Sequence, residues 1–599
     1  MLSLVTYSPA GRWGYSFLPL PLHRMKYIIH HTKPHLRYIT VETLIEDIDN
    51  ELIEIQMPAW RPGRYELGNF AKNVRNFIVE DTEGNPLPYM KVNKDLWQVQ
   101  TLGAEAVKIS YEYFAATLDA GSTYTDAQLL YVNPVNCLMY ETTKLNEECT
   151  LQLNVAENFT IACPLPKKGN ILIAENFDQL ADSPLIASPN MQYSSFDLQG
   201  ALHHIWVNGA NTLDLEKFAR LVQQYTQEQV NIFGKFDATE YHYLIHLLPY
   251  SHRHGVEHKY CTVIVLGPGE EFNKEEKLND LLAICSHELF HFWNVKRIRP
   301  AAMWPYNFAK ENYSVLGYVY EGVTTYYGDY MLLRSGVLNF DAYSVEISKD
   351  LQRHFNNDGR YNYSVAESSF DTWLDGYTAG APGRKVSIYV EGMLAALIAD
   401  VKIRTATKHK NSLDTVMNLM YQRFYLNNKG YTEKDYQEVL EETGGQDMLL
   451  YFKEIIWGKG NIEKYLPDTF AALGLKIEQS PSQHVYENTY GFKVIHIEGA
   501  TIINSCAANS PADNMGLALG DVITGVNGLP ITTETILDDV INQNSVQELQ
   551  LTLKSIFGER TVSLLADGKT YFSQYKLLKN QDATAEQKQF FEAWSKQAF

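Results

Sequence analysis

The sequence predicts a multidomain α+β protein, because the spacing of its apolar residues changes twice along the chain. From about residue 26 to 160, apolar and polar residues alternate, which is typical of half-buried strands. From about 273 to 455, apolar residues recur at helical spacing, and a β-rich pattern returns after about 483. A chain of 599 residues allows about three to five domains. We therefore expect an N-terminal antiparallel β-domain, a mainly helical middle region and a β-rich C-terminal domain.

The composition excludes several classes of protein. Hydrophobic residues make up 45% and charged residues 20% of the chain, which is the balance of a globular protein rather than a disordered or fibrous one. Lys and Arg number 51 against 71 Asp and Glu, giving a formal net charge of −20. Such an excess of acid argues against a nucleic-acid partner.

Cysteines and apolar runs bear on the compartment. The 6 cysteines are scattered without a C-x-x-C pair, so neither a disulfide scaffold nor a structural zinc module is expected. No apolar run approaches the ~20 residues that a membrane span needs. Residues 1–24 lack a basic start and contain several prolines, unlike a secretory signal. We expect a cytoplasmic protein in which residues 1–24 are a leader or upstream extension of doubtful status.

The strongest chemical signal is His287-Glu288-Leu289-Phe290-His291, an H-E-x-x-H pattern within a predicted helix over 277–292. The i, i+4 spacing puts both imidazoles on one helix face, where they can bind one metal ion. Glu288 lies beside them and suits a base acting on metal-bound water. The alternative is two ordinary histidines on a half-buried helix. The apolar neighbours Leu281 and Leu289 argue against it, because a buried polar trio is costly unless it binds something.

Catalytic zinc needs a third protein ligand. A helix predicted over 313–333 offers Glu321 within Tyr320–Tyr327, where a carboxylate among aromatic and small residues would be costly without a partner. The alternative is a surface glutamate on an amphipathic helix. Spacing alone leaves both interpretations open, because a third ligand can lie at many distances.

The segment 287–300, H-E-L-F-H-F-W-N-V-K-R-I-R-P, followed by E-G-V-T-T-Y-Y at 321–327, resembles the M61 family of glycyl aminopeptidases. The resemblance implies a thermolysin-like catalytic domain with one zinc ion held by His287, His291 and Glu321. It also implies that Glu288 is the general base, and that the substrates are peptides with a free N-terminus and a small first residue such as Gly or Ala.

Two further segments extend the resemblance over the first half of the chain. Pro58–Tyr65 looks like the P-x-W-x-P-G-x-Y turn of the family's N-terminal β-domain. Gly255-Val256-Glu257-His258 resembles the family's G-G-L-E-H. That element occupies the position of the G-x-M-E-N motif of the related M1 aminopeptidases, whose glutamate binds the substrate's free α-amine. Glu257 is therefore the expected amine-binding residue, with Gly255 beside it, in a segment that we expect to form a loop. The alternative is an exposed loop acid, and His254 replaces the motif's first glycine.

Tyr389 is the expected oxyanion donor. The segment 387–392, S-I-Y-V-E-G, resembles the family's S-Y-Y-x-K-G, and a phenol beside zinc can support the charge that develops in the transition state. Ile388 and Glu391 depart from the family pattern, so a packed core tyrosine is the alternative interpretation.

The C-terminal region resembles a PDZ domain through 510–523 and 526–528. Tyr490, Gly491 and Phe492 are the expected loop that holds a peptide or protein C-terminus, with the peptide adding a strand to the sheet. The alternative is a domain that only packs on the catalytic body. The expected division is a leader at 1–24, a β-domain at 25–190, a zinc peptidase domain at 191–480, a PDZ domain at 481–580 and a terminal helix at 581–599.

The function expected from these residues is that of a zinc aminopeptidase. Two other classes stay open. One is a zinc endopeptidase with the same chemistry, which follows if Glu257 points away from the cleft. The other is a non-catalytic adaptor that carries a PDZ domain, which the intact trio of His287, His291 and Glu321 makes less favoured.

Overall fold

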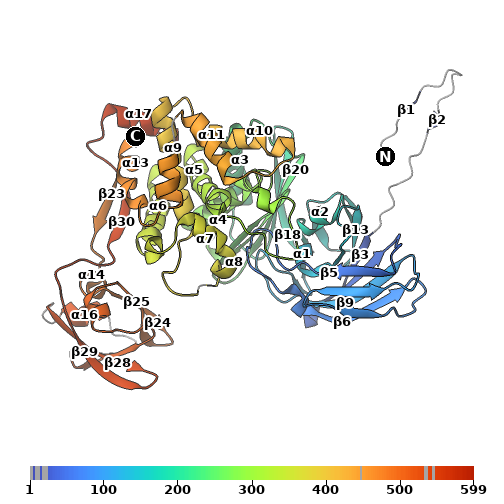
Figure 1. Cartoon of the computed structure of the whole chain (residues 1–599), viewed down its shortest axis with the longest axis horizontal. Helices are drawn as coiled ribbons and strands as arrows, with labels where there is room; N and C mark the ends of the chain where they lie inside the picture. The colour runs from blue at the N-terminus through green and yellow to red at the C-terminus, as the bar shows by residue number, and fades with distance from the viewer. Residues whose placement is uncertain are drawn as a thin grey trace. The chain divides into compact units, whose positions relative to one another are not determined.

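The structure is a computed structural model that describes residues 25–378, 380–445, 448–531, 537–542 and 547–599, preceded by the paired short strands β1 (Val5–Thr6) and β2 (Gly14–Tyr15) (Figure 1). The rest of the doubtful leader lies outside the described residues. The chain forms two compact units, the first made of 1–339, 359–462 and 595–597, and the second of 340–358, 463–594 and 598–599. None of the helices in the described ranges is long and apolar enough to cross a membrane.

The first unit begins with three β-sheets, drawn in blue to cyan in Figure 1. The seven-stranded sheet has the order β15-β16-β13-β3-β4-β9-β6, and two four-stranded sheets have the orders β12-β5-β8-β7 and β10-β11-β17-β14. The strands are β3 (Met25–Lys33), β4 (Tyr38–Ile45), β5 (Leu52–Gln56), β6 (Val74–Asp81), β7 (Tyr89–Lys91), β8 (Leu96–Gln100), β9 (Val107–Phe114), β10 (Tyr124–Asp126), β11 (Leu129–Val132), β12 (Tyr140–Glu141), β13 (Cys149–Asn154), β14 (Thr160–Ala162), β15 (Lys167–Lys168), β16 (Ile171–Ala174) and β17 (Leu185–Ser188).

The alternating apolar pattern does produce these strands. In β4, every second residue from Ile39 to Ile45 is buried, so one face of the strand packs into the core. Among the described strands of these three sheets, the pairs are antiparallel except that β13 runs parallel to β3. Two short helices, α1 (Pro134–Cys137) and α2 (Phe177–Ala181), lie between strands.

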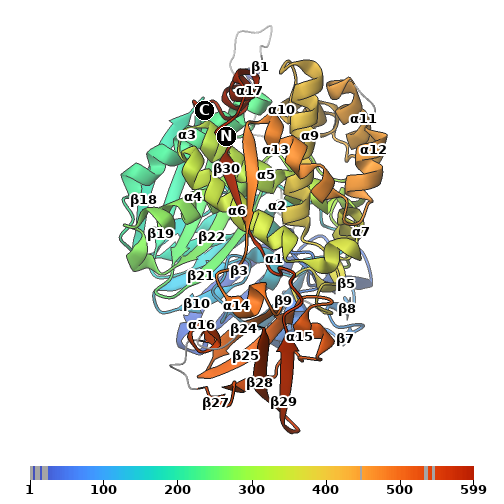
Figure 2. The ribbon, with the colours of Figure 1, turned by 90° about the vertical axis from the view of Figure 1, so that its left-hand side faces the viewer.

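A mixed five-stranded sheet follows, with the order β18-β19-β20-β22-β21. Its strands are β18 (Met191–Leu198), β19 (Ala201–Asn208), β20 (Glu240–Leu247), β21 (His252–Glu257) and β22 (Cys261–Gly267). The three inner strands are parallel and the two edge strands antiparallel. Helix α3 (Leu215–Phe233), which the sequence predicts, connects β19 to β20 and packs near α4 beside this sheet (Figure 2).

Helices pack on one another in the rest of the first unit. They are α4 (Glu275–Phe290), a π-helical turn (Tyr318–Val323), α5 (Thr324–Arg334), α7 (Val365–Phe370), α8 (Thr372–Asp375), α9 (Ile388–Thr407), α10 (Leu413–Arg423), α11 (Glu433–Gly444) and α12 (Leu449–Tyr451). The helix predicted over 313–333 is corrected at its start, because helical structure begins only at Tyr318 and begins as a π-helix.

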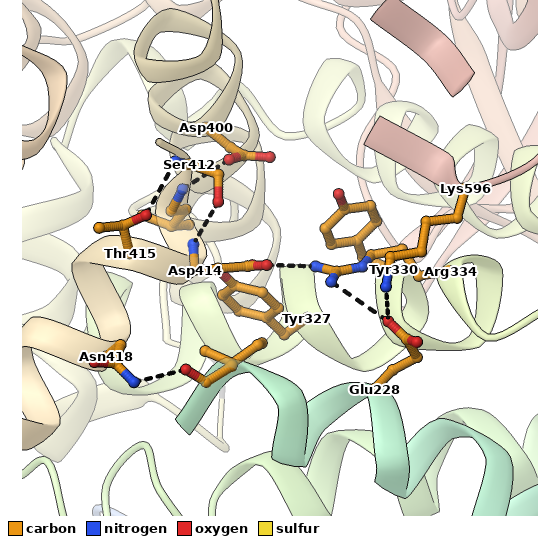
Figure 3. Close-up of polar contacts among 12 residues, drawn as sticks. Glu228, Tyr327, Tyr330, Arg334, Asp400, Ser412, Asp414, Thr415, Asn418 and Lys596 are labelled. Atoms are coloured by element: carbon orange, nitrogen blue, oxygen red, sulfur yellow. Dashed lines mark hydrogen bonds and ion pairs between the residues drawn. The ribbon is translucent and has the colours of Figure 1, made fainter. Parts of the chain in front are cut away.

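A polar network links α5 to the neighbouring helices α3 and α10 (Figure 3). The Arg334 guanidinium contacts Asp414 at 2.7 Å and Glu228 at 3.4 Å, and the Tyr327 hydroxyl donates to Asp414 over 2.9 Å. Lys596, near the end of the chain, pairs with the same Glu228 at 2.5 Å. These contacts link α3, α5 and α10 to one another, which is the kind of support that a precisely spaced site needs.

The second unit contains α6 (Phe340–Phe355) and the C-terminal elements α13 (Leu466–Ala472), β23 (Leu475–Ser480), α14 (Val485–Asn488), β24 (Phe492–Ile497), β25 (Ala500–Cys506), α15 (Pro511–Asn514), β26 (Val522–Val526), β27 (Leu529–Pro530), α16 (Leu537–Asn542), β28 (Glu548–Ser555), β29 (Gly558–Leu565), β30 (Gln574–Lys579) and α17 (Ala585–Ser595). The expected terminal helix is therefore present. Helix α6 packs on β30, where the Leu577 N–H donates to Ser348 Oγ over 2.9 Å.

Candidate metal centre and peptide cleft

Helix α4 carries the H-E-x-x-H pattern at its C-terminal end. His287 and Glu288 lie within the helix, and His291 follows directly as its C-cap residue with a helical backbone. The backbone of α5 approaches α4 closely at Gly328, where a side-chain Cβ would lie only 3.2 Å from the His287 Cα. The close packing of α5 against α4 thus holds His287 in place.

The structure brings His287, His291 and Glu321 together. The His287 and His291 Nε2 atoms are 3.1 Å apart, and Glu321 Oε2 lies 3.4 Å from His291 Nε2 and 3.8 Å from His287 Nε2. Ligand atoms bound at about 2.0–2.2 Å around a tetrahedral zinc ion lie about 3.3–3.6 Å from one another. The three distances therefore lie close to this spacing, one within the range and the other two just below and just above it.

Glu321 sits in the middle of the π-helical turn Tyr318–Val323. Such wide turns are frequent at functional sites. This turn packs closely on α9, since a Cβ on Gly322 would lie 2.4 Å from the Gly392 Cα. Two facing glycines thus let the two backbones meet and bring Glu321 to the histidines.

Hydrogen bonds determine which atoms of these residues remain available to bind a metal ion. The Nδ1 atom of His291 lies 2.7 Å from the Asn294 carbonyl oxygen, which fixes Nδ1 as the protonated nitrogen and leaves Nε2 free. The Tyr65 hydroxyl donates to Glu321 Oε1 over 3.1 Å, which leaves Oε2 facing the histidines. This arrangement of partners around the ligand atoms is typical of metal sites.

The electrostatics of the group also suit a cation. Burial opposes the protonated form of His291, but the Glu321 and Glu257 carboxylates outweigh it and raise the pKa of His291 to about 9. Burial, followed by the Glu257 and Glu321 charges, raises the pKa of Glu288 above its usual range. Three buried carboxylates around one imidazole form a negative environment that a divalent ion would neutralise.

Glu257 is not the exposed loop acid of the alternative interpretation, and its segment is not the loop that we expect. It is the last residue of the edge strand β21 and is 3% exposed. Its side chain groups with Glu288 and His291, the ligand atoms all lying within 4.8 Å of one another. Its Oε1 atom is buried and has no hydrogen-bond partner among the described residues. A buried carboxylate oxygen without a partner indicates a position for a cationic group.

Two glycines leave space for these carboxylates. A Cβ on Gly255 would lie 2.3 Å from Glu288 Oε1, and a Cβ on Gly63 would lie 2.5 Å from Glu257 Oε2. Gly63 also has a φ of +84°, which favours glycine at this turn. The Pro58–Tyr65 turn of the N-terminal sheets therefore contributes directly to the cleft, through Gly63 and Tyr65.

Tyr389 lies beside the same group, with its ring centroid 6.4 Å from that of His287. Burial, and then the Glu321 charge, raises the pKa of Tyr389 well above its usual range, so the phenol stays protonated. Its hydroxyl shares a hydrogen bond with Tyr377, which sequence reasoning did not single out. A neutral phenol near the histidines is a hydrogen-bond donor for developing negative charge.

The segment after the H-E-x-x-H pattern ties the cleft to the N-terminal sheets. The Lys296 ammonium contacts Asp182 at 2.8 Å, and His258 Nδ1 lies 3.0 Å from the same carboxylate oxygen. Asp182 directly follows α2, and His258 directly follows Glu257. Sequence reasoning missed this role of Lys296 and His258, although both belong to the motifs that carry the resemblance.

A second group of candidate ligands, His204, Glu240 and His242, lies on β19 and β20. The two rings stack with centroids 4.4 Å apart at 20°, so their nitrogen lone pairs run parallel rather than converge. The Trp206 indole N–H donates to His242 Nδ1 over 3.3 Å, which leaves the proton of a neutral His242 on Nε2. This geometry favours a polar contact between His242 Nε2 and the Glu240 carboxylate, 3.6 Å away, over a metal site.

In the second unit, Tyr490, Gly491 and Phe492 precede and begin the edge strand β24. Both aromatic side chains are buried in the local core, and Gly491 has a φ of +76°. The Gly491 N–H donates to the Glu487 carbonyl over 3.2 Å. One of the amides expected to receive a peptide carboxylate is thus engaged within the chain.

Comparisons with known proteins agree with this geometry. The M61 N-terminal domain matches residues 26–189, the M61 glycyl aminopeptidase domain matches 280–395 and a PDZ domain matches 502–551. The chain carries both M61 peptidase domains and a PDZ domain. The M61 match supports a metallopeptidase and suggests zinc as its metal.

One solved structure shares the fold of most of the chain. An aminopeptidase N family protein from Idiomarina loihiensis is 23% identical, with a TM-score of 0.87 over 95% of this chain and 99% of that one. An M1 zinc metallopeptidase from Deinococcus radiodurans is 12% identical, with a TM-score of 0.45 over 73% of this chain and 94% of that one. The search of curated proteins finds no match.

Proposed function

We propose that this M61 protein is a zinc-dependent aminopeptidase that removes small N-terminal residues from peptides. His287, His291 and Glu321 would hold one zinc ion. Bound there, zinc supplies a Lewis acid for the attack of water on the scissile carbonyl. Their mutual distances of 3.1, 3.4 and 3.8 Å support this assignment.

The remaining residues each take one part of the reaction. Glu288 accepts the proton of the attacking water and later gives it to the leaving amine. The Tyr389 hydroxyl donates a hydrogen bond to the negative charge that develops on the carbonyl oxygen. Glu257 binds the substrate's α-ammonium through a charge-assisted hydrogen bond.

The observation that carries the aminopeptidase assignment is the buried Glu257 Oε1, which has no hydrogen-bond partner in the part of the chain that the structure describes and belongs to a group with Glu288 and His291 whose ligand atoms lie within 4.8 Å of one another. An ammonium there places the first peptide bond next to the general base. The preference for a small first residue rests on the match to the M61 glycyl aminopeptidase domain.

The deciding experiment compares a peptide with a free N-terminus against its N-acetylated form on the zinc-loaded protein. The proposal predicts release of free N-terminal Gly or Ala from the first and negligible cleavage of the second. Equal rates would instead indicate the endopeptidase, and no cleavage of either would indicate the adaptor.

For the PDZ region, we propose that a peptide adds to the edge strand β24.

A further inference from the structure

The strand that carries Glu257 also carries an arginine on the same face. Side chains alternate along a strand, so Arg253, Gly255 and Glu257 of β21 share one face. A Cβ on Gly255 would lie 2.3 Å from Glu288 Oε1 and 2.9 Å from Ile284 Cγ1. The shared face is therefore turned toward α4 and the cleft.

Strand β21 and helix α4 run in the same direction. Gly255 lies against Ile284 and Glu288, and Glu257, two residues later, lies against Glu288 and His291. Arg253 is therefore displaced by about 6.6 Å from Gly255, in the direction away from Glu257. It lies toward the N-terminal half of α4.

The route of a bound peptide follows from these positions. The Pro58–Tyr65 turn lies against the amine side of the site, because Gly63 packs against Glu257 and the Tyr65 hydroxyl donates to Glu321. No described strand covers the outer edge of β21, so an extended peptide can lie along it. With its ammonium at Glu257, the peptide continues past Gly255 toward Arg253.

Arg253 is available to a ligand. Its side chain is exposed, and no acid among the described residues forms an ion pair with it. Asp280, one turn before Ile284 on α4, is paired with Lys277 at 3.7 Å. A guanidinium without a partner can bind a carboxylate with two parallel hydrogen bonds.

We propose that Arg253 binds a substrate carboxylate on the second or third residue after the scissile bond. The enzyme would then prefer peptides that have an acidic side chain at one of these positions, or whose C-terminal carboxylate lies there. The two-residue step from Gly255 to Arg253, at about 3.3 Å per residue, sets this distance. The inference rests on the proposed aminopeptidase function, because it takes the peptide's direction from an ammonium at Glu257.

The test compares peptides that share the N-terminus Gly-Ala, using the zinc-loaded full chain. Gly-Ala-Ala as free acid and as amide tests a terminal carboxylate. The amides of Gly-Ala-Glu-Ala and Gly-Ala-Ala-Glu, each against its Gln counterpart, test a side-chain carboxylate. Where Arg253 reaches the carboxylate of a pair, we expect kcat/KM to be about five- to tenfold higher for the peptide with the carboxylate than for its neutral counterpart. Arg253→Gln should abolish this ratio and Arg253→Lys should keep part of it.

A matched control is Arg220→Gln on α3, which removes another exposed arginine that has no ion pair among the described residues. It should leave the ratios unchanged, and 0.5 M salt should reduce the ratios of the parent protein. Equal ratios in the parent and Arg253→Gln would overturn the proposal. If no peptide is hydrolysed, the proposed function fails, and the Arg253 site is then tested by measuring the affinities of the same peptide pairs by calorimetry. Equal affinities of the parent and Arg253→Gln for the charged peptides would overturn the Arg253 site independently of the proposed function.

Discussion

The Tyr65 hydroxyl donates a hydrogen bond to Glu321 Oε1 over 3.1 Å, although 256 positions separate the two residues. Tyr65 belongs to the N-terminal β region and Glu321 to the helices that carry the candidate metal ligands. The bond leaves Glu321 Oε2 toward His287 and His291. A residue of one matched M61 domain thus orients a proposed ligand of the other.

Removing this hydroxyl should weaken metal binding. We expect Tyr65→Phe to lower zinc affinity or activity about 10- to 100-fold, as is usual when the partner of a ligand is lost. The measurement is a competition titration with a chelator. Tyr111→Phe is the matched control, because it removes a buried hydroxyl that donates to the Cys137 carbonyl over 2.7 Å, away from the cleft. Equal zinc affinities in both variants would remove Tyr65 from the site.

Changing the general base should separate chemistry from metal binding. We expect Glu288→Gln to keep full zinc content and to lose about 10²- to 10⁴-fold in kcat, because a neutral amide cannot accept the proton. Glu321→Ala should instead lower the zinc content, which metal analysis measures directly. An active Glu288→Gln protein would refute the proposed mechanism, and full zinc content in Glu321→Ala would refute that ligand.

Neutralising Glu257 should remove the dependence on a free N-terminus. We expect Glu257→Gln to lower kcat/KM for a free-amine peptide about 10- to 150-fold, the value of a hydrogen bond to a charged group. The rate for the N-acetylated peptide should stay the same. Glu270→Gln, at an exposed position, serves as the matched control. A parallel loss on both peptides would show that Glu257 acts on the metal centre rather than on the amine.

The contact between Lys296 and Asp182 should stabilise the fold. The Lys296 side chain is fully buried and lies 2.8 Å from Asp182. Lys296→Met leaves the carboxylate without its ammonium partner, so we expect a loss of about 3 kcal/mol, visible as a lower melting temperature. Lys274→Met removes an exposed lysine from Glu271, 2.7 Å away, and should leave the melting temperature almost unchanged. Similar shifts in both variants would contradict a structural role for the buried pair.

The same pair gives a pH dependence whose sign can be stated. Burial raises the pKa of Asp182, but Lys296 and His258 outweigh it and hold that pKa well below its usual range. Asp182 therefore adds stability above the unfolded pKa of about 3.9, and this contribution falls as the pH falls toward the native value. The stability difference between the parent and Asp182→Asn should shrink from pH 6 to pH 3. A difference that is constant over this range would contradict the shift.

The sequence predicts more of the site's ligands than of their support. His287, Glu288 and His291 follow from local spacing, because both ligand positions lie on one helical turn. Glu321 needed the family resemblance, since a distant third ligand has no fixed spacing. The hydrogen bond from Tyr65 was not predictable, because it depends on two segments that meet only after folding.

Parts of the fold depend in the same way on distant partners. The residues of β21 indicated a loop, because a short polar segment with Gly255 shows no alternating apolar pattern. It becomes a strand by pairing with β22, which is nearly all buried. Helix α6 has a helical pattern in the sequence, yet nothing in that pattern shows that it packs on β30, more than 200 positions later.

The wide turn at Tyr318–Val323 makes the ligand set sensitive to chain length at one place. Each residue of an ordinary α-helix turns the chain by about 100°. Deleting a single residue here could convert the turn to a regular helix and rotate Glu321 relative to α5 by that angle. An insertion or deletion of one residue, harmless in most surface loops, would then uncouple the carboxylate from both imidazoles without altering any of the three.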